Sequence, residues 1–179
     1  MALNGEVVVT PDVTGAFAQQ VLEAFRSRPQ DHFALALTGS DDARDCYTRL
    51  AADAGSHIDW WKVDVYWADE RCVPHDHEDS NYRLGRESLL ERVGAVDANF
   101  PMRCEEGADP YQLRIGELGR FDLVHLGLGN FFRAHAAAYT HDLPGSDTGR
   151  PEWGFAAFGG RVPGGDGATP GSGPGSSVV

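Results

Sequence analysis

The stretch that decides the fold is Val63-Asp64-Val65-Tyr66-Trp67-Ala68-Asp69-Glu70-Arg71-Cys72-Val73-Pro74. Its first five residues form a largely apolar, strand-like run, and the charged cluster Asp69-Glu70-Arg71 follows almost at once. Open α/β sheets place their ligand sites just beyond the carboxyl ends of the strands. An arginine there can bind a phosphate through two parallel hydrogen bonds, because its guanidinium presents a fixed fork of donors. The stretch therefore predicts an α/β sheet with a site for an anionic ligand.

On both sides of this stretch, short apolar runs alternate with segments of helical periodicity, as in parallel sheets with helices between the strands. The predicted strands are 6–10, 33–37, 63–67 and 121–126. The predicted helices begin at Pro11-Asp12, after Ser40, at Ser80 or Asn81 with a stop at Gly94, and near Tyr111. This order predicts the α/β class, with a three-layer, open, mostly parallel sheet of Rossmann-like topology that is incomplete at its C-terminus.

Composition predicts one domain followed by a tail. The chain has 179 residues with 41% hydrophobic content, enough to bury a core, so residues 1–150 are predicted to form one α/β domain that is partial after residue 129. From Gly154 onward the chain is rich in Gly, Pro and Ser and poor in apolar residues. Residues 151–179 are therefore predicted to be a disordered tail.

Charge and cysteine content narrow the partners and the compartment. A formal net charge of −12 argues against nucleic acid or an anionic membrane as the main partner. The N-terminus has neither the basic nor the apolar region of an export signal, and no apolar run is long enough to span a bilayer. Cys46, Cys72 and Cys104 are odd in number and widely spaced, so we expect three reduced thiols. These features predict a cytoplasmic protein.

A second candidate loop is Thr38-Gly39-Ser40, which leads from a predicted strand into a helix. Gly39 lets backbone N–H groups approach an anion at a helix N-terminus. Asp41 and Asp42 come next; they suit the helix dipole but repel a phosphate. The alternative is that these two carboxylates only stabilise the helix start.

The order Trp-x-Asp-Glu-Arg-x-Val-Pro at 67–74, followed by Ser80-Asn81-Tyr82 and a helix, resembles the 6-phosphogluconolactonases. These enzymes of the pentose phosphate pathway open 6-phosphogluconolactone to 6-phosphogluconate. The related glucosamine-6-phosphate deaminases share the fold but usually carry a different acidic signature here, so Asp69-Glu70-Arg71 favours the lactonases. The resemblance covers about residues 6–129, and it implies a sugar-phosphate substrate and no metal or other cofactor.

The resemblance also implies a set of substrate-binding residues. They are Thr38, Gly39, Ser40, Asp69, Glu70, Arg71, Asn81, Gly127 and Gly129. Arg71 matches a position that contacts the substrate phosphate in the family, while Asp69 and Glu70 help to hold the pocket. The alternative for Arg71 is an internal salt bridge to one of these carboxylates, which needs no ligand.

The third loop carries the candidate catalytic base. The resembled family has Gly-x-Gly-Pro-Asp-Gly-His-Thr, whose histidine is the proposed base. Here the stretch reads Gly127-Leu128-Gly129-Asn130-Phe131-Phe132-Arg133-Ala134-His135, so the glycines match, the aspartate is missing and the histidine comes two positions late. His135 is the candidate base, ahead of His141; the alternative is an ordinary surface histidine. A reading-frame change shortly after Gly129 would explain both this departure and the altered C-terminal segment.

The sequence leaves two function classes open. One is an enzyme, either a 6-phosphogluconolactonase or a sugar-phosphate isomerase or deaminase of the same fold. The other is a non-catalytic remnant that binds a sugar phosphate weakly. The run His75-Asp76-His77-Glu78-Asp79 contains metal-ligand residue types, but histidines two apart point in different directions and no second ligand cluster accompanies them. We expect a solvated loop there and no metal site.

Overall fold

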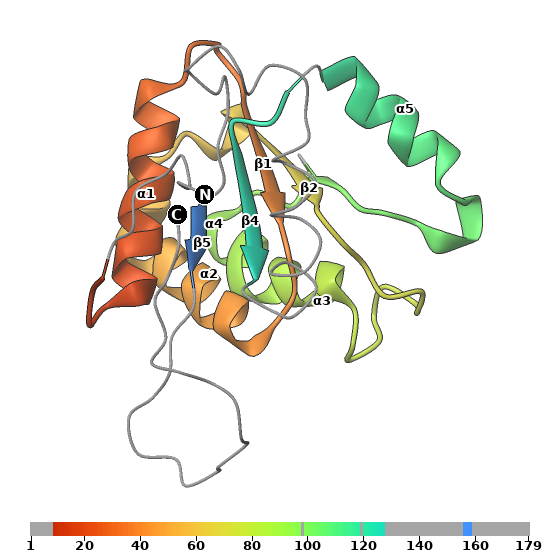
Figure 1. Cartoon of the computed structure of the whole chain (residues 1–179), viewed down its shortest axis with the longest axis horizontal. Helices are drawn as coiled ribbons and strands as arrows, with labels where there is room; N and C mark the ends of the chain where they lie inside the picture. Colours follow the sequence, from red (N-terminus) through yellow and green to blue (C-terminus); the bar gives the residue numbers. More distant parts are fainter. Residues whose placement is uncertain (1–8, 98, 119, 128–155, 159–179) are drawn as a thin grey trace, which may run out of the picture.

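The computed structural model describes residues 9–97, 99–118, 120–127 and 156–158, and a parallel sheet forms its centre. The strand order is β3-β2-β1-β4-β5, with β1 at Phe33–Leu37, β2 at Val63–Trp67, β3 at Asn99–Phe100, β4 at Leu123–Gly127 and β5 at Ala156–Phe158 (Figure 1). The described helices are α1 Val13–Ser27, α2 Asp41–Asp53, α3 Asn81–Gly85, the π-helical turn η3 Arg86–Leu90, α4 Glu91–Val93 and α5 Asp109–Leu118. Three 3-10 turns, η1 Gly55–His57, η2 Trp60–Lys62 and η4 Cys104–Glu106, complete these elements. This strand order is Rossmann-like and confirms the predicted fold class.

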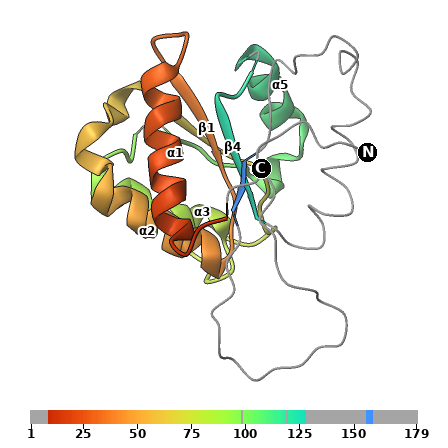
Figure 2. The same ribbon diagram turned by 60° about the vertical axis from the view of Figure 1, so that its left-hand side comes forward.

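Helices cover both faces of the sheet, which makes three layers. Figure 2 shows α1 and α2 on one side of β1 and β4, and α5 on the other. Alternate residues of a strand face opposite sides, and β1 follows this rule. Phe33, Leu35 and Leu37 join the larger apolar cluster with α1 and α2, whereas Ala34 and Ala36 join the smaller one beneath α5. Because β1 is buried on both faces, its sequence is a continuous apolar run.

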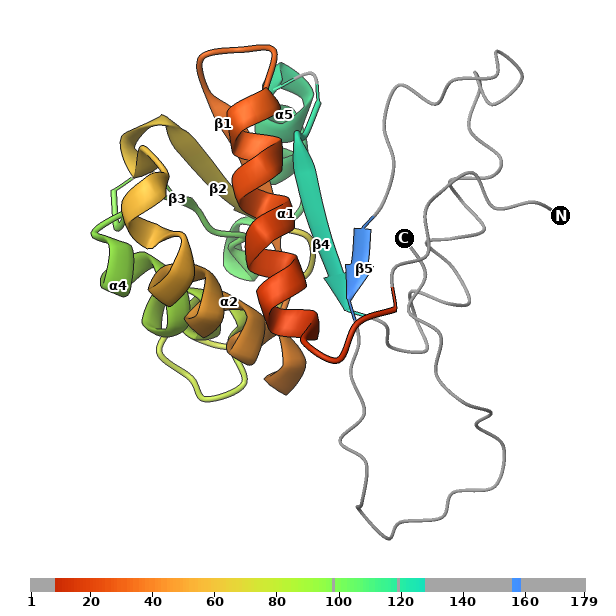
Figure 3. The ribbon, with the colours of Figure 1, turned by 90° about the vertical axis from the view of Figure 1, so that its left-hand side faces the viewer.

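The helices begin and end where the sequence predicts. The Asp12 carboxylate accepts the Gly15 N–H at 2.9 Å and caps α1, which lies along β4 in Figure 3. Ser80 caps α3, and the helical run from α3 through α4 ends at Gly94, which adopts a left-handed φ of 71°. Glycine is favoured at that position because it has no Cβ to clash.

Three short segments differ from the sequence-based predictions. In the predicted strand 6–10, Val9 and Thr10 are not in a strand, and residues 6–8 lie outside the described residues. Strand β3 was not predicted, because two residues carry no readable periodicity. Within the segment predicted to be a disordered tail, Ala156–Phe158 pairs in parallel with β4; the rest of 151–179 lies outside the described residues. Sheet pairing, which composition does not report, orders these three residues.

The prediction of three reduced thiols is wrong for two of them. Cys72 and Cys104 form a disulfide, with their Cα atoms 5.4 Å apart across a sequence separation of 32 residues. Only Cys46 is a free thiol among the described residues, and burial raises its pKa to about 12. Spacing alone did not reveal the pair, because the loop after β2 meets η4 only through the tertiary fold. None of the helices in the described ranges is both long and apolar enough to cross a membrane.

Candidate functional site

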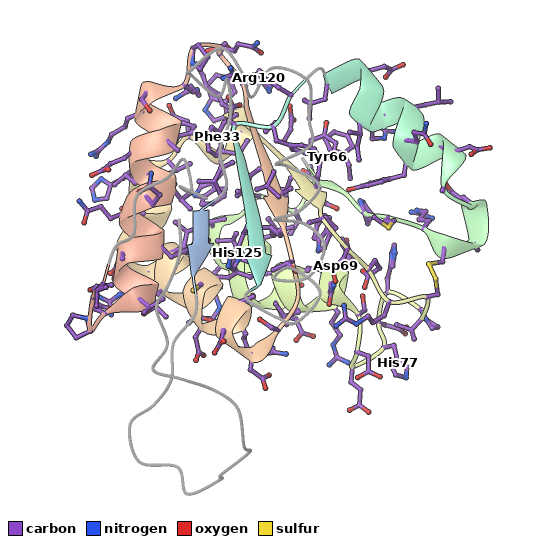
Figure 4. All side chains as sticks on the ribbon, viewed as in Figure 1. Phe33, Tyr66, Asp69, His77, Arg120 and His125 are labelled. Carbon is purple, nitrogen blue, oxygen red and sulfur yellow. A yellow bond between two sulfur atoms is a disulfide. The ribbon has the colours of Figure 1, made fainter. Side chains whose placement is uncertain are left out.

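The predicted site loops leave neighbouring strands at the same edge of the sheet. Leu37 and Trp67, the last residues of β1 and β2, are paired in register, and β4 lies on the other side of β1. Gly127 ends β4 at this edge. In Figure 4, Asp69 lies beyond the arrowheads of these strands, whereas Phe33 lies towards their opposite end. Strand order reverses between β1 and β4, and this is the place where open α/β sheets bind ligands.

Asp69 is the centre of a polar cluster at this edge. Its Oδ1 accepts the Thr38 hydroxyl at 2.6 Å. Its Oδ2 accepts both Arg71 Nη1 at 2.7 Å and Asn81 Nδ2 at 3.0 Å. The side chains of Asp69 and Arg71 are about half exposed, at 47% and 50%. The internal salt bridge considered for Arg71 is therefore present, and it holds the guanidinium at the rim of the site.

Gly39 gives the Asn81 side chain room to reach this cluster. A Cβ built on Gly39 would lie 1.7 Å from Asn81 Oδ1, closer than any real contact. From this place Asn81 Nδ2 also donates to the Asp69 carbonyl at 3.0 Å. The glycine predicted to admit an anion thus has its side-chain space filled by an amide. Close packing between the loop after β1 and the start of α3 requires glycine here.

Glu70 anchors the second loop to α3. Its carboxylate accepts the backbone N–H groups of Asn81 at 2.7 Å and Tyr82 at 2.8 Å, as well as that of Arg71 at 2.8 Å. It also accepts the Ser80 hydroxyl at 3.3 Å. The first N–H groups of a helix have no partner within the helix, and the helix dipole favours a negative charge there. Glu70 therefore ties the Asp69 and Arg71 loop to the N-terminus of α3.

Ser40 and the two following aspartates begin α2. The Ser40 hydroxyl oxygen accepts the Ala43 N–H at 3.0 Å, so it serves as the N-cap. Asp41 and Asp42 lie in the first turn, where the dipole favours carboxylates. These contacts fit the alternative in which this segment starts a helix.

Tyr47 and His125 lie behind the cluster and were not predicted as site residues. The Tyr47 hydroxyl lies 2.9 Å from the Thr38 backbone nitrogen and 2.9 Å from His125 Nδ1. Burial raises the pKa of Tyr47 and lowers that of His125 to about 4, so both are neutral at pH 7. One signal in the sequence could have identified His125. It stands within the apolar strand β4, and a buried histidine needs a polar partner.

Of the remaining predicted residues, one lies at the end of β4 and the others lie outside the described residues. Gly127 pairs with Phe158 at the end of β4, whereas Gly129 and His135 lie outside the described residues. His75, from the loop predicted to be solvated, has its Nε2 3.2 Å from the Met102 carbonyl oxygen. Within the described ranges, no group of three or more His, Cys, Asp or Glu side chains is arranged to hold a metal ion.

Two surface hollows lie away from these loops. One, of about 450 Å³, lies between α1 and α2 and is bordered by Asp12, Arg49 and Asp53. The other, of about 220 Å³, lies beside β3 and is bordered by Phe100 and Arg114. Neither is lined by the Asp69 cluster, which is a surface site whose chemistry comes from converging side chains.

The fold and these loops define an α/β protein with a polar cluster at the switch point of a Rossmann-like sheet. Residues 8–138 match the family described as glucosamine-6-phosphate isomerases/6-phosphogluconolactonase. The chain belongs to this family, which confirms the resemblance found in its sequence.

Individual relatives agree with this assignment. The 6-phosphogluconolactonase of Synechocystis sp. is 34% identical over 110 residues, which cover 54% of this chain and 45% of that protein. The one from Nostoc sp. is 30% identical over 151 residues, covering 74% and 61%. The solved 6-phosphogluconolactonase from Shewanella baltica has a TM-score of 0.59 at 28% identity, covering 69% of this chain and 55% of that chain. The chain thus spans about half the length of the curated relatives it matches.

Proposed function

We propose that this chain carries the sugar-phosphate site of a 6-phosphogluconolactonase, which hydrolyses 6-phospho-D-glucono-1,5-lactone to 6-phosphogluconate. The observation that carries the proposal is the convergence of Thr38, Arg71 and Asn81 on Asp69 at the ligand-binding edge of the sheet. Membership of the family supports it, as do the names of the relatives. The net charge of −12 repels a phosphate overall, so a fixed local cation is needed.

In this proposal Arg71 binds the phosphate. A guanidinium carries five N–H donors, and the contact with Asp69 uses Nη1. Arg71 can therefore keep its place against Asp69 while other donors bind phosphate oxygens. Thr38 and Asn81 orient Asp69, and Glu70 holds the loop against α3. Gly39, Ser40, Gly127 and Gly129 complete the proposed binding set.

Hydrolysis of the lactone needs a base to deprotonate water and N–H donors for the oxyanion that forms at the carbonyl. We assign the base to His135, with no metal or other cofactor. The alternative function is a non-catalytic sugar-phosphate binder, favoured by the absent aspartate and by the late position of His135. A sugar-phosphate isomerase or deaminase is a further alternative, and turnover of glucosamine 6-phosphate would distinguish it.

Arg71→Ala is expected to weaken binding of 6-phosphogluconate roughly 10-fold or more, because a hydrogen bond to a charged group contributes about 1.5–3 kcal/mol. Isothermal titration of the full chain measures this change. Arg86→Ala is the matched control, since Arg86 is as exposed as Arg71 but pairs with Glu91 away from the cluster. Equal affinities of wild type and Arg71→Ala would leave Arg71 only its salt bridge to Asp69.

Turnover of 6-phosphogluconolactone by this chain is expected to be low or absent. General-base catalysis contributes roughly 10²–10⁴-fold, and misplacing a group by about 1 Å can cost on the order of 10²-fold. An assay of lactone hydrolysis above the spontaneous rate tests this, with His141→Ala as the control for His135→Ala. Robust hydrolysis that disappears only in His135→Ala would contradict the expectation and establish the shifted histidine as the base.

A cytoplasmic location is the remaining part of the proposal. The disulfide between Cys72 and Cys104 removes the support that three reduced thiols gave. Fractionation of cells that produce the full chain would decide the compartment.

A further inference from the structure

The Tyr47 hydroxyl has three polar neighbours, and they define one arrangement of protons. The oxygen lies 2.9 Å from the Thr38 backbone nitrogen, 3.0 Å from the Thr38 carbonyl oxygen and 2.9 Å from His125 Nδ1. A hydroxyl has one proton to donate and two lone pairs. The Thr38 N–H can only donate and the Thr38 carbonyl can only accept, so the tyrosine proton goes to the carbonyl. His125 Nδ1 must then carry a proton and donate it to Tyr47.

This arrangement satisfies both backbone groups of one loop residue. Thr38 is the first residue after β1, where the strand ladder has ended. The Tyr47 hydroxyl takes the place of a neighbouring strand as the partner of both the N–H and the C=O of Thr38. These two bonds fix the peptide units before and after Thr38. Thr38 is 7% exposed and Tyr47 fully buried, so water does not compete for these bonds. Unpaired backbone groups in such a place are costly.

The hydrogen bonds continue from the buried side to the exposed cluster. The Thr38 hydroxyl donates to Asp69 at 2.6 Å, and Asp69 accepts Arg71 Nη1 at 2.7 Å. At the buried end, the His125 ring packs against Phe17 with centroids 4.7 Å apart and is 2% exposed. A buried pair from α2 and β4 is thus connected through Thr38 and Asp69 to the half-exposed guanidinium of Arg71.

We propose that Tyr47 and His125 are positioning residues that set the orientation of Thr38 and, through it, of Asp69 and Arg71. The effect that we expect on ligand binding rests on the proposed function. Neither residue touches the proposed ligand. Both act on the site through the Thr38 backbone.

The test compares Tyr47→Phe with Tyr111→Phe in the full chain. The Tyr111 hydroxyl is a matched control, because it bridges the backbone N–H and C=O of Trp67 at 2.8 Å each but does not contact Thr38. Tyr47→Phe is expected to weaken 6-phosphogluconate binding about 5-fold and to speed amide exchange of Thr38 about 10-fold or more, because the N–H loses its buried acceptor. Tyr111→Phe is expected to leave both within about twofold of wild type, since the deleted bonds lie at β2.

Two further measurements keep the proposal falsifiable if Tyr47→Phe does not fold. Nitrogen-15 NMR of the wild type is expected to find the Nδ1-protonated tautomer of His125, and the opposite tautomer would overturn the proposal. His125→Leu keeps the two bonds between Tyr47 and Thr38, so it is expected to fold and to weaken binding about threefold, more than Tyr111→Phe and less than Tyr47→Phe. Unchanged Thr38 exchange in a folded Tyr47→Phe would also overturn the inference. If the wild type binds no 6-phosphogluconate, the proposed function fails. The amide exchange of Thr38 and the tautomer of His125 still test whether Tyr47 and His125 position Thr38.

Discussion

Glu70→Ala is expected to lower the free energy of unfolding by about 3 kcal/mol, because a hydrogen bond to a charged group contributes about 1.5–3 kcal/mol and the contributions of several bonds to one carboxylate do not add in full. The carboxylate accepts three backbone N–H groups and the Ser80 hydroxyl. Two of those N–H groups belong to the first turn of α3. They would lose their acceptor, because an alanine side chain at position 70 cannot accept a hydrogen bond. Denaturant unfolding monitored by fluorescence of the four tryptophans measures the change.

Two controls separate the carboxylate's contacts from the loss of a surface charge. Glu70→Gln keeps the shape but has one acceptor oxygen, so about half of the loss is expected. Glu87→Ala removes an exposed glutamate that pairs with Arg83 one helical turn away, and its effect should be small. Glu70→Ala with wild-type stability would mean that the loop after β2 does not depend on its anchor to α3. Loss of the anchor should also release Asn81 from Asp69 and weaken ligand binding.

Loss of the disulfide between Cys72 and Cys104 is expected to lower the free energy of unfolding by about 3–4 kcal/mol. The bond closes a loop across a separation of 32 residues, and the chain-entropy model assigns that magnitude to a loop of this length. Cys72 directly follows Arg71 in sequence, so its bond to the residues before α5 also restrains the site loop. Denaturant unfolding with and without reductant measures the change in wild type.

The Cys72→Ser/Cys104→Ser double variant is the control, because reductant should have no further effect on it. A thiol titration of the unfolded, unreduced protein should find one free thiol, that of Cys46. Three free thiols would restore the prediction made from the sequence. An unfolding midpoint unchanged by reductant would show that the bond contributes nothing to stability.

The sequence predicted the main elements because their signals are local. The apolar run Phe33–Leu37 and the helical spacing of Phe17, Val21 and Phe25 each report burial within a few residues. The composition of the tail did not predict β5, because no local pattern reports the pairing of its three residues with β4. Strand 6–10 was read from the same kind of apolar run, yet Val9 is 85% exposed.

By itself, the sequence determined that a parallel sheet forms and that the loops after its strands meet at one edge. Parallel strands with regular crossovers leave the sheet at their carboxyl ends, so this follows from element order alone. Only the tertiary structure decided what each side chain does there. Glu70 reaches Asn81 across 11 residues, Cys72 reaches Cys104 across 32, and Tyr47 reaches His125 across 78. These contacts depend on how helices pack on the sheet, because packing brings together side chains that no local spacing relates.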